Sequence, residues 1–109
     1  LRRRFAVEMA ALFESWDVLL APATPIPAPL IGQQTMEFDG TSVPLRPNLG
    51  MYTQPISFIG LPVVLAPICR PRALPVGVQI IAAPWREDLA LRAASALATA
   101  GVARTAQID

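Results

Sequence analysis

The chain has 109 residues, of which 53% are hydrophobic and 16% charged, and its formal net charge is +1. A net charge this close to zero gives no electrostatic basis for binding nucleic acid or an anionic membrane. A free-standing domain of this size exposes much of its surface and usually carries more charge. We therefore expect part of the apolar surface to face other parts of a longer chain.

Reactive side chains are scarce. The sequence contains neither His nor Lys, and Cys69 is its one cysteine. Without an imidazole or an amine, these residues cannot form a Ser–His–Asp, Cys–His or Ser–Lys group by themselves. Zinc held by His or by several Cys is excluded on the same ground. We expect no metal site and no cofactor.

No targeting or membrane-spanning segment is predicted. The arginines at 2–4 lead into Glu8 and Glu14 rather than into an uninterrupted apolar stretch, which argues against a signal peptide. No apolar run approaches the roughly 20 residues of a spanning helix. A single Cys69 cannot form an internal disulfide. These features predict a cytoplasmic protein that does not bind membranes.

The first part of the chain predicts a helix, a strand and a long loop. Residues 2–15 form the helix, because apolar side chains recur there at spacings of three and four. A short strand follows at 18–21 and stops at Pro22. Residues 22–47 are rich in proline and aperiodic, with Asp39-Gly40 as the tip of a small hairpin. Long ordered loops of this kind often border an active site.

The second part predicts a helix, two strands and a final helix. Residues 49–59 form a helix if Pro55 lies in its first turn, and residue 60 is a glycine able to end it. The apolar runs 63–68 and 76–81 fit neighbouring strands buried inside a helix-covered sheet. Residues 86–100 form the last helix, with an apolar stripe of Leu89, Ala93 and Leu97.

Four segments, in this order, resemble the C-terminal part of the amidase signature family: 17–25 (DVLLAPATP), 53–55 (TQP), 60–62 (GLP) and 74–81 (LPVGVQII). Three further segments are similar to the 1-carboxybiuret hydrolase-like subgroup: 25–33 (PIPAPLIGQ), 46–50 (RPNLG) and 82–88 (AAPWRED). The resemblance implies an α/β fold, the C-terminal portion of a layered α/β/α amidase with a mixed, twisted sheet.

The same resemblance implies a reaction. Members of the family cleave an amide C–N bond with a Ser nucleophile, a second Ser in a cis peptide arrangement and a Lys base. In the family these residues lie upstream of the region matched here. We therefore expect residues 1–109 to be a single segment of an amidase domain that lines the pocket and is inactive alone.

Four residues are candidates for binding substrate: Arg46, Tyr52, Thr53 and Gln54. A guanidinium can clamp a carboxylate through two parallel hydrogen bonds, although Arg46 could instead lie at a loop surface or pair with an acidic neighbour, Glu37 or Asp39.

Tyr52, Thr53 and Gln54 can hydrogen-bond an amide or a carboxyl group. Thr53 could instead cap a helix that has Pro55 in its first turn. In relatives that form amide donors for transfer RNA charging, an acidic residue precedes the Tyr-Thr pair and recognises an amino group. The matching position here is Gly50, which argues against an α-amino acid amide and leaves room for a small or carboxylated amide.

An alternative to the amidase portion remains open on sequence alone. The chain could be a stand-alone, non-catalytic remnant that binds a ligand or pairs with another subunit. For the amidase reading, the expected partner is a small-molecule amide, and both self-association and a partner subunit are left open.

Overall fold

The computed structural model describes residues 1–105 of the chain. Its elements follow the order α1 (Arg2–Phe13), β1 (Val18–Pro22), β2 (Thr35–Phe38), β3 (Thr41–Pro44), α2 (Leu45–Asn48), α3 (Gln54–Ile59), β4 (Val63–Ile68), β5 (Val76–Ala82) and α4 (Glu87–Thr99). None of the helices within this range is both long and apolar enough to cross a membrane.

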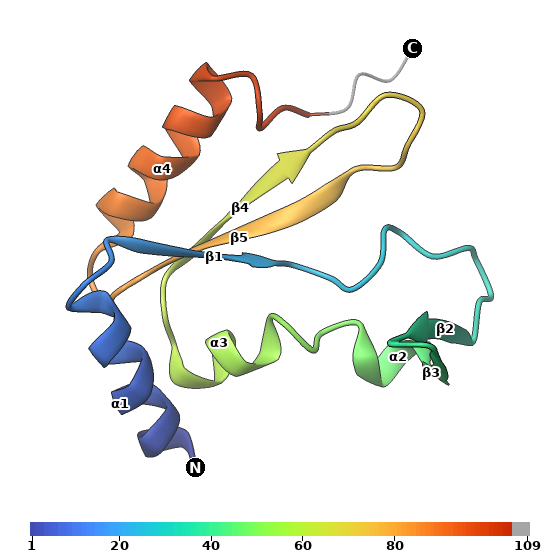
Figure 1. Ribbon diagram of the computed structural model, residues 1–109, viewed down its shortest axis with the longest axis horizontal. Coiled ribbons are helices and arrows are strands. Elements are labelled where there is room, and N and C mark those ends of the chain that lie inside the picture. The colour runs from blue at the N-terminus through green and yellow to red at the C-terminus, as the bar shows by residue number, and fades with distance from the viewer. Residues whose placement is uncertain (106–109) are drawn as a thin grey trace.

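A three-stranded sheet of order β1-β5-β4 lies between the helices (Figure 1). Ile80 of β5 is opposite Leu20 of β1 on one side and Val64 of β4 on the other. The two predicted strands 63–68 and 76–81 are thus confirmed as neighbours, and β5 continues one residue further. The strand pairs found within residues 1–105 are antiparallel, whereas the resemblance implied a mixed sheet for the larger fold.

Helices cover both faces of the sheet. On one face, Ile80 belongs to a buried cluster with Ala90 of α4. On the other face, Ile81 belongs to a second buried cluster with Met9 of α1 and Ile56 of α3. Successive residues of a strand point to opposite faces, so adjacent isoleucines of β5 anchor different helical layers. This arrangement is the α/β/α layering that the resemblance implied.

The two apolar strands differ in burial. Residues 79–82 of β5 are all buried, because β5 has a strand on each side and helices over both faces. In β4 only Ala66 is buried, and Val63 and Leu65 are 39% and 59% exposed. β4 is an edge strand of the sheet in the described part of the chain. Burial inside the sheet is confirmed for β5, whereas β4 lies at the edge of the sheet within residues 1–105 and is only partly buried there.

The proline-rich segment contains a hairpin, as the Asp39-Gly40 pair predicted. β2 and β3 pair from Phe38↔Thr41 onward, and the two residues between them are Asp39 and Gly40. Their φ angles are 51° and 74°. Two positive φ angles are what the favoured two-residue hairpin turn requires. The hairpin and the single turn of α2 that follows it give the segment more regular structure than the sequence predicted.

The helix predicted over 49–59 is shorter than expected. α3 begins at Gln54, because Pro55 lacks an N–H and fits a helix only in its first turn. It ends as predicted at Gly60, whose φ of 73° is the left-handed conformation that commonly closes helices. Residues 49–53 are left as a series of turns between α2 and α3.

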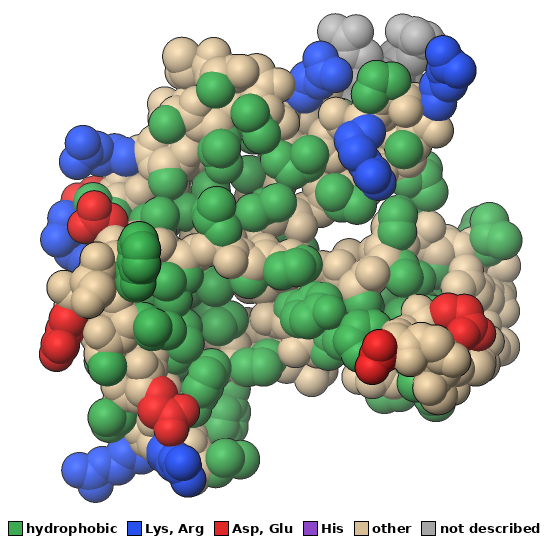
Figure 2. Space-filling view, viewed as in Figure 1, with side chains coloured by type: hydrophobic (Ala, Val, Ile, Leu, Met, Phe, Trp, Pro, Cys, Tyr) green, Lys and Arg blue, Asp and Glu red, His purple; other side chains and the backbone are tan. Residues whose placement is uncertain are grey.

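Large hydrophobic side chains remain on the surface. Figure 2 shows them spread over the middle of one face, with charged side chains toward its margins. The exposed ones include Leu20, Leu65, Phe58 and Leu91, which come from β1, β4, α3 and α4. The apolar excess in the composition is therefore not all used in the core of this chain.

Candidate functional site

A groove of about 1030 Å³ lies between α1 and α3. Most of its wall is apolar, and the residues that supply this wall are Leu1, Phe5, Met51, Pro55 and Phe58. Its polar residues are Arg4, Glu8, Thr53, Gln54 and Ser57. An apolar concavity with a few polar groups is typical of small-molecule sites.

Contacts between α1 and α3 hold the two walls together. The guanidinium carbon of Arg2 lies 5.6 Å from the centroid of the Phe58 ring, within the range of a cation–π contact. Met9 and Ile56 pack in the same buried cluster and join the helices to the sheet. The groove is therefore set by tertiary packing rather than by one loop.

The charges at the groove are balanced. Arg4 Nε donates to Glu8 Oε1 at 3.0 Å, one turn further along α1. Both side chains are exposed, and exposed pairs of this kind add little stability. Arg4 and Glu8 therefore offset each other's charge where they line the groove.

Two of the four predicted site residues lie in this groove. Thr53 and Gln54 are adjacent on its α3 wall. Tyr52 precedes them and is half-buried, but it does not line the groove. Arg46 lies on α2, where it is exposed and outside the groove. The structure thus brings Thr53 and Gln54 together and leaves Arg46 apart from them.

Arg46 does not form the ion pairs that the sequence left open. Within residues 1–105 the ion pairs are Arg4–Glu8 and Arg86–Asp88. Pairing of Arg46 with Glu37 or Asp39 is therefore not part of this structure, and the exposed surface position is the alternative that the structure supports.

Thr53 occupies the N-cap position of α3 without capping it. Its Oγ1 donates backward to the Gly50 carbonyl at 3.4 Å, and it accepts no hydrogen bond from the helix. The expected capping role is therefore wrong for its side chain, although the position is correct. A hydroxyl that donates still has lone pairs available to accept, so Thr53 can receive an N–H from a ligand.

Gln54 is folded back over Gly50. A Cβ built on Gly50 would lie 3.1 Å from both Cγ and Nε2 of Gln54. The space that a side chain at position 50 would take is therefore used by the carboxamide of Gln54. A carboxamide both donates and accepts without carrying charge, which suits a neutral amide ligand.

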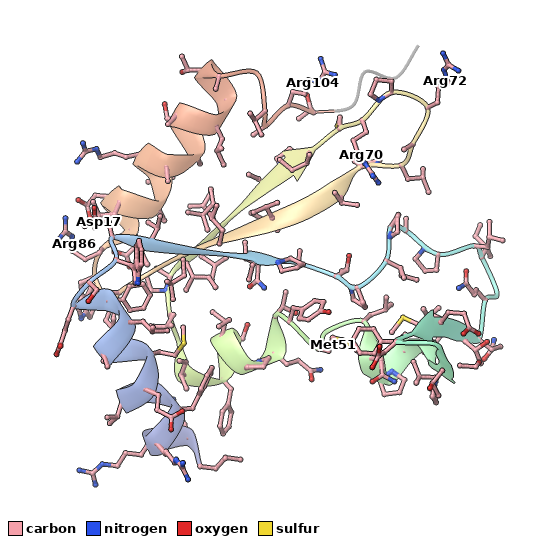
Figure 3. The ribbon with its side chains drawn as sticks, in the orientation of Figure 1. Asp17, Met51, Arg70, Arg72, Arg86 and Arg104 are labelled. Atoms are coloured by element: carbon pink, nitrogen blue, oxygen red, sulfur yellow. The ribbon has the colours of Figure 1, made fainter. Side chains whose placement is uncertain are left out.

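The five charged residues that Figure 3 labels lie away from Met51, which lines the groove. Arg70 and Arg72 belong to the β4–β5 loop and Arg104 follows α4. Figure 3 shows these three at the other end of the sheet from Asp17 and Arg86. None of them lines the groove.

One pair outside the groove has shifted pKa values. Arg86 Nε and Nη2 donate to Asp88 Oδ1 and Oδ2 at 3.0 Å and 3.1 Å. The hydrogen bond from Arg86 lowers the pKa of Asp88, and the same bond raises the pKa of Arg86, with a smaller contribution from the charge of Asp17. This pair lies at the start of α4 and is not part of the groove.

Sequence reasoning missed the apolar wall of the groove. Phe5 is one of the apolar residues that predict the helix 2–15, whereas Met51 and Phe58 fit no pattern in the sequence. Phe58 falls off the face that Ile56 and Ile59 share, and it is 53% exposed. A large aromatic residue on the polar side of a short helix is the signal that could have pointed to this surface.

The family is decided by comparison with known sequences. A family model described as Amidase matches residues 1–91. The chain belongs to the amidase family. It is 51% identical over 105 residues to the 1-carboxybiuret hydrolase subunit AtzE of Pseudomonas sp. (strain ADP), in an alignment that covers 94% of this chain and 23% of that protein. It is 32% identical over 98 residues to a fatty acid amide hydrolase of Medicago truncatula, covering 89% of this chain and 16% of that protein.

Solved structures agree with this family. One, described as "An unexpected vestigial protein complex reveals the evolutionary origins of an s-triazine catabolic enzyme", has a TM-score of 0.91 and 50% identity, over 97% of this chain and 24% of that one. A "Crystal structure of amidase" has a TM-score of 0.83 and 26% identity, over 91% and 23%. This amidase chain therefore spans about a quarter or less of the length of its relatives. The resemblance seen in the sequence is confirmed.

Proposed function

We propose that this chain is a structural and pocket-lining portion of a cytoplasmic amidase that hydrolyses a small amide at its C–N bond. One observation carries the proposal. Thr53 and Gln54, predicted from the family resemblance to contact substrate, lie side by side on the wall of an apolar groove. Residues 1–109 would form one segment of the amidase domain, and they correspond to about a quarter of the relatives' length.

The reaction would use a Ser nucleophile, a second Ser and a Lys base, as the family resemblance implies. The base must lie within hydrogen-bond reach of the nucleophile, and donors must face the oxyanion that forms. The 109 residues contain no Lys and no His. In this proposal the reacting groups come from other parts of the enzyme, while the chain described here holds and shapes the substrate.

The groove favours a small, uncharged or carboxylated amide. Thr53 can accept an N–H, and Gln54 can bind a carbonyl or an N–H. No acidic side chain stands at position 50, so a substrate amino group would find no carboxylate there. Tyr52 would contribute beside this pair, and Arg46 would meet a carboxylate only if the substrate extends toward α2. The first relative named above is a 1-carboxybiuret hydrolase subunit, which agrees with a carboxylated amide.

A partner subunit is a second element of the proposal. Two solved structures similar to this chain are described as a vestigial protein complex, and this chain exposes large apolar side chains on β1 and β4. The alternative, a stand-alone module, predicts that the isolated chain is a monomer that unfolds cooperatively. Size-exclusion chromatography and urea unfolding of the isolated chain distinguish the two.

Hydrolysis assays of the enzyme that contains this chain test the pocket assignment. The substrates would be propanamide, benzamide, biuret and malonamate. Thr53→Val removes the hydroxyl and keeps the shape, so we expect KM to rise about three- to tenfold, the cost of one lost hydrogen bond. Thr99→Val, at the exposed end of α4, is the matched control. Equal KM values for all three proteins would contradict the proposed pocket.

A further inference from the structure

Gln79 is a buried polar side chain in the middle of an apolar strand. It is 2% exposed, and its neighbours Ile80 and Ile81 are 0% and 2% exposed. Burying a carboxamide is unfavourable unless its groups are hydrogen-bonded. A hydrophobic residue would fill this place in β5 without that requirement, so the amide calls for an explanation.

The amide of Gln79 joins two segments that are far apart in the sequence. Nε2 donates to the carbonyl of Pro22 at 2.9 Å, across 57 positions, and to the carbonyl of Tyr52 at 2.9 Å, across 27 positions. Pro22 ends β1, and Tyr52 stands two residues before α3. One side chain from the central strand therefore fixes the end of β1 and the approach to α3 at the same time.

This link ties the segment 48–54 to the sheet by a hydrogen bond, next to the apolar packing of Ile56 of α3 against Ile81. Apart from the bonds inside α2 and α3, the other hydrogen bonds of this segment in the part of the chain that the structure describes have both partners between residues 44 and 57. They shape the turns locally but do not place them over the sheet. The bond from Gln79 to Tyr52 does so, and the next two residues, Thr53 and Gln54, form the polar wall of the groove.

We propose that Gln79 is a positioning residue: it holds the Tyr52 backbone on the sheet and thereby sets where Thr53 and Gln54 meet the substrate. The inference rests on the pocket proposed above. Gln79 acts through the backbone of Tyr52 and does not itself line the groove. Its loss should therefore weaken substrate binding more than it slows the chemical step.

Substitutions at position 79 separate positioning from general stability. Gln79→Met keeps the length and removes both donors. Gln79→Glu keeps the shape, but its carboxylate only accepts and would face two carbonyl oxygens. Once protonated, it donates one hydrogen bond again. Ile80→Val is the control, because Ile80 is equally buried on the same strand but packs toward α4.

The variants would be made in the enzyme that contains this chain, with the four amides above as substrates. For Gln79→Met we expect KM to rise about three- to tenfold with kcat less affected, and for Ile80→Val no change in KM. For Gln79→Glu we expect the ratio of its KM to the wild-type KM to fall as the pH is lowered from about 8 to about 6. Buried carboxyls become protonated in this range. A flat ratio, or equal KM shifts in Gln79→Met and Ile80→Val, would overturn the inference.

Amide hydrogen exchange without substrate keeps the test independent of activity. In Gln79→Met we expect exchange at residues 51–54 to become at least about tenfold faster, while Ile80→Val leaves it unchanged. Unchanged exchange in Gln79→Met would overturn the inference and leave the proposed function standing. Faster exchange without any change in KM would contradict the pocket assignment and, with it, the positioning role.

Discussion

The side chain of Leu65 lies over Gly77, the residue of β5 that stands diagonally across from it. A Cβ built on Gly77 would come within 3.0 Å of Leu65 Cδ1 and within 3.0 Å of Ala23 Cβ. Gly77 does not have a positive φ, so its lack of a side chain is needed for close packing rather than for an unusual backbone. β4, β5 and the end of β1 meet here without a gap.

Gly77→Ala should therefore destabilise the protein by about 1–3 kcal/mol through overpacking. Urea unfolding measures the effect. In a Leu65→Ala background, which removes one of the two contacts, Gly77→Ala should lower the free energy of unfolding by less. Equal losses in both backgrounds would mean that Leu65 does not limit the space at position 77.

Ala90 sets how closely α4 approaches the sheet. It is fully buried and belongs to the cluster of Ile80 and Ala66. Ala90→Leu should cost about 1–3 kcal/mol or more, because a larger side chain would push the helix away from the sheet. Ala98→Leu, on the exposed side of the same helix, should stay within about 0.5 kcal/mol of wild type. Thermal or urea unfolding of the two variants would show whether burial decides the difference.

The position of Arg46 makes a sharp test of carboxylate recognition. If the guanidinium binds a carboxylate, Arg46→Ala should raise KM for malonamate about tenfold or more and leave KM for propanamide unchanged. Arg92→Ala, on the exposed surface of α4, controls for the loss of one positive charge. Equal effects on the two substrates would remove Arg46 from the binding site.

Gly50 makes room for Gln54, so a methyl group at position 50 should move the carboxamide. Its backbone lacks a positive φ, and the atoms that a Cβ would meet belong to a flexible, exposed side chain. Gly50→Ala should thus change stability little and raise KM several-fold. The same substitution combined with Gln54→Ala should have no further effect on KM, since the displaced group is then absent. An additive effect would contradict this coupling.

The lowered pKa of Asp88 predicts a pH dependence of stability. A carboxyl whose pKa is lower in the folded state stabilises the protein above its unfolded pKa, about 3.9, and this contribution disappears as the pH falls through the folded value. The free energy of unfolding of Asp88→Asn should therefore differ from that of the wild type at pH 7, and the two values should converge at acidic pH. Arg86→Gln should remove the same dependence, because Arg86 supplies the hydrogen bond. Both groups are solvent-exposed, so the effect should be small and should weaken in high salt.

Local chemistry made parts of the fold predictable. The strands 63–68 and 76–81 follow from their apolar runs, the hairpin tip from Asp39-Gly40, and the end of α3 from Gly60, and each is confirmed. Pro55 also limits where α3 can begin. In each case a few neighbouring residues determine the backbone.

The remaining features depend on contacts between distant segments. Nothing in the sequences of β4 and β5 says which is central, because that depends on β1 pairing with β5. The groove forms where α1 meets α3, so Phe5 and Phe58 gain a shared role only in three dimensions. Gln79 lies inside the predicted strand 76–81, but the two carbonyl groups that it binds, those of Pro22 and Tyr52, come from distant segments and cannot be identified from the strand's own sequence.

The buried amide also bears on how the strands find their alignment. β1 is short, and Leu19 and Leu20 are alike, so their order alone discriminates weakly between neighbouring registers. If β1 paired with β5 one residue out of register, each side chain of β1 would point to the opposite face of the sheet. Gln79, which is opposite Ala21 in the observed register, would then lose its hydrogen bond to the Pro22 carbonyl. A buried carboxamide without that acceptor is unfavourable. Gln79 would therefore destabilise the shifted register relative to the observed one.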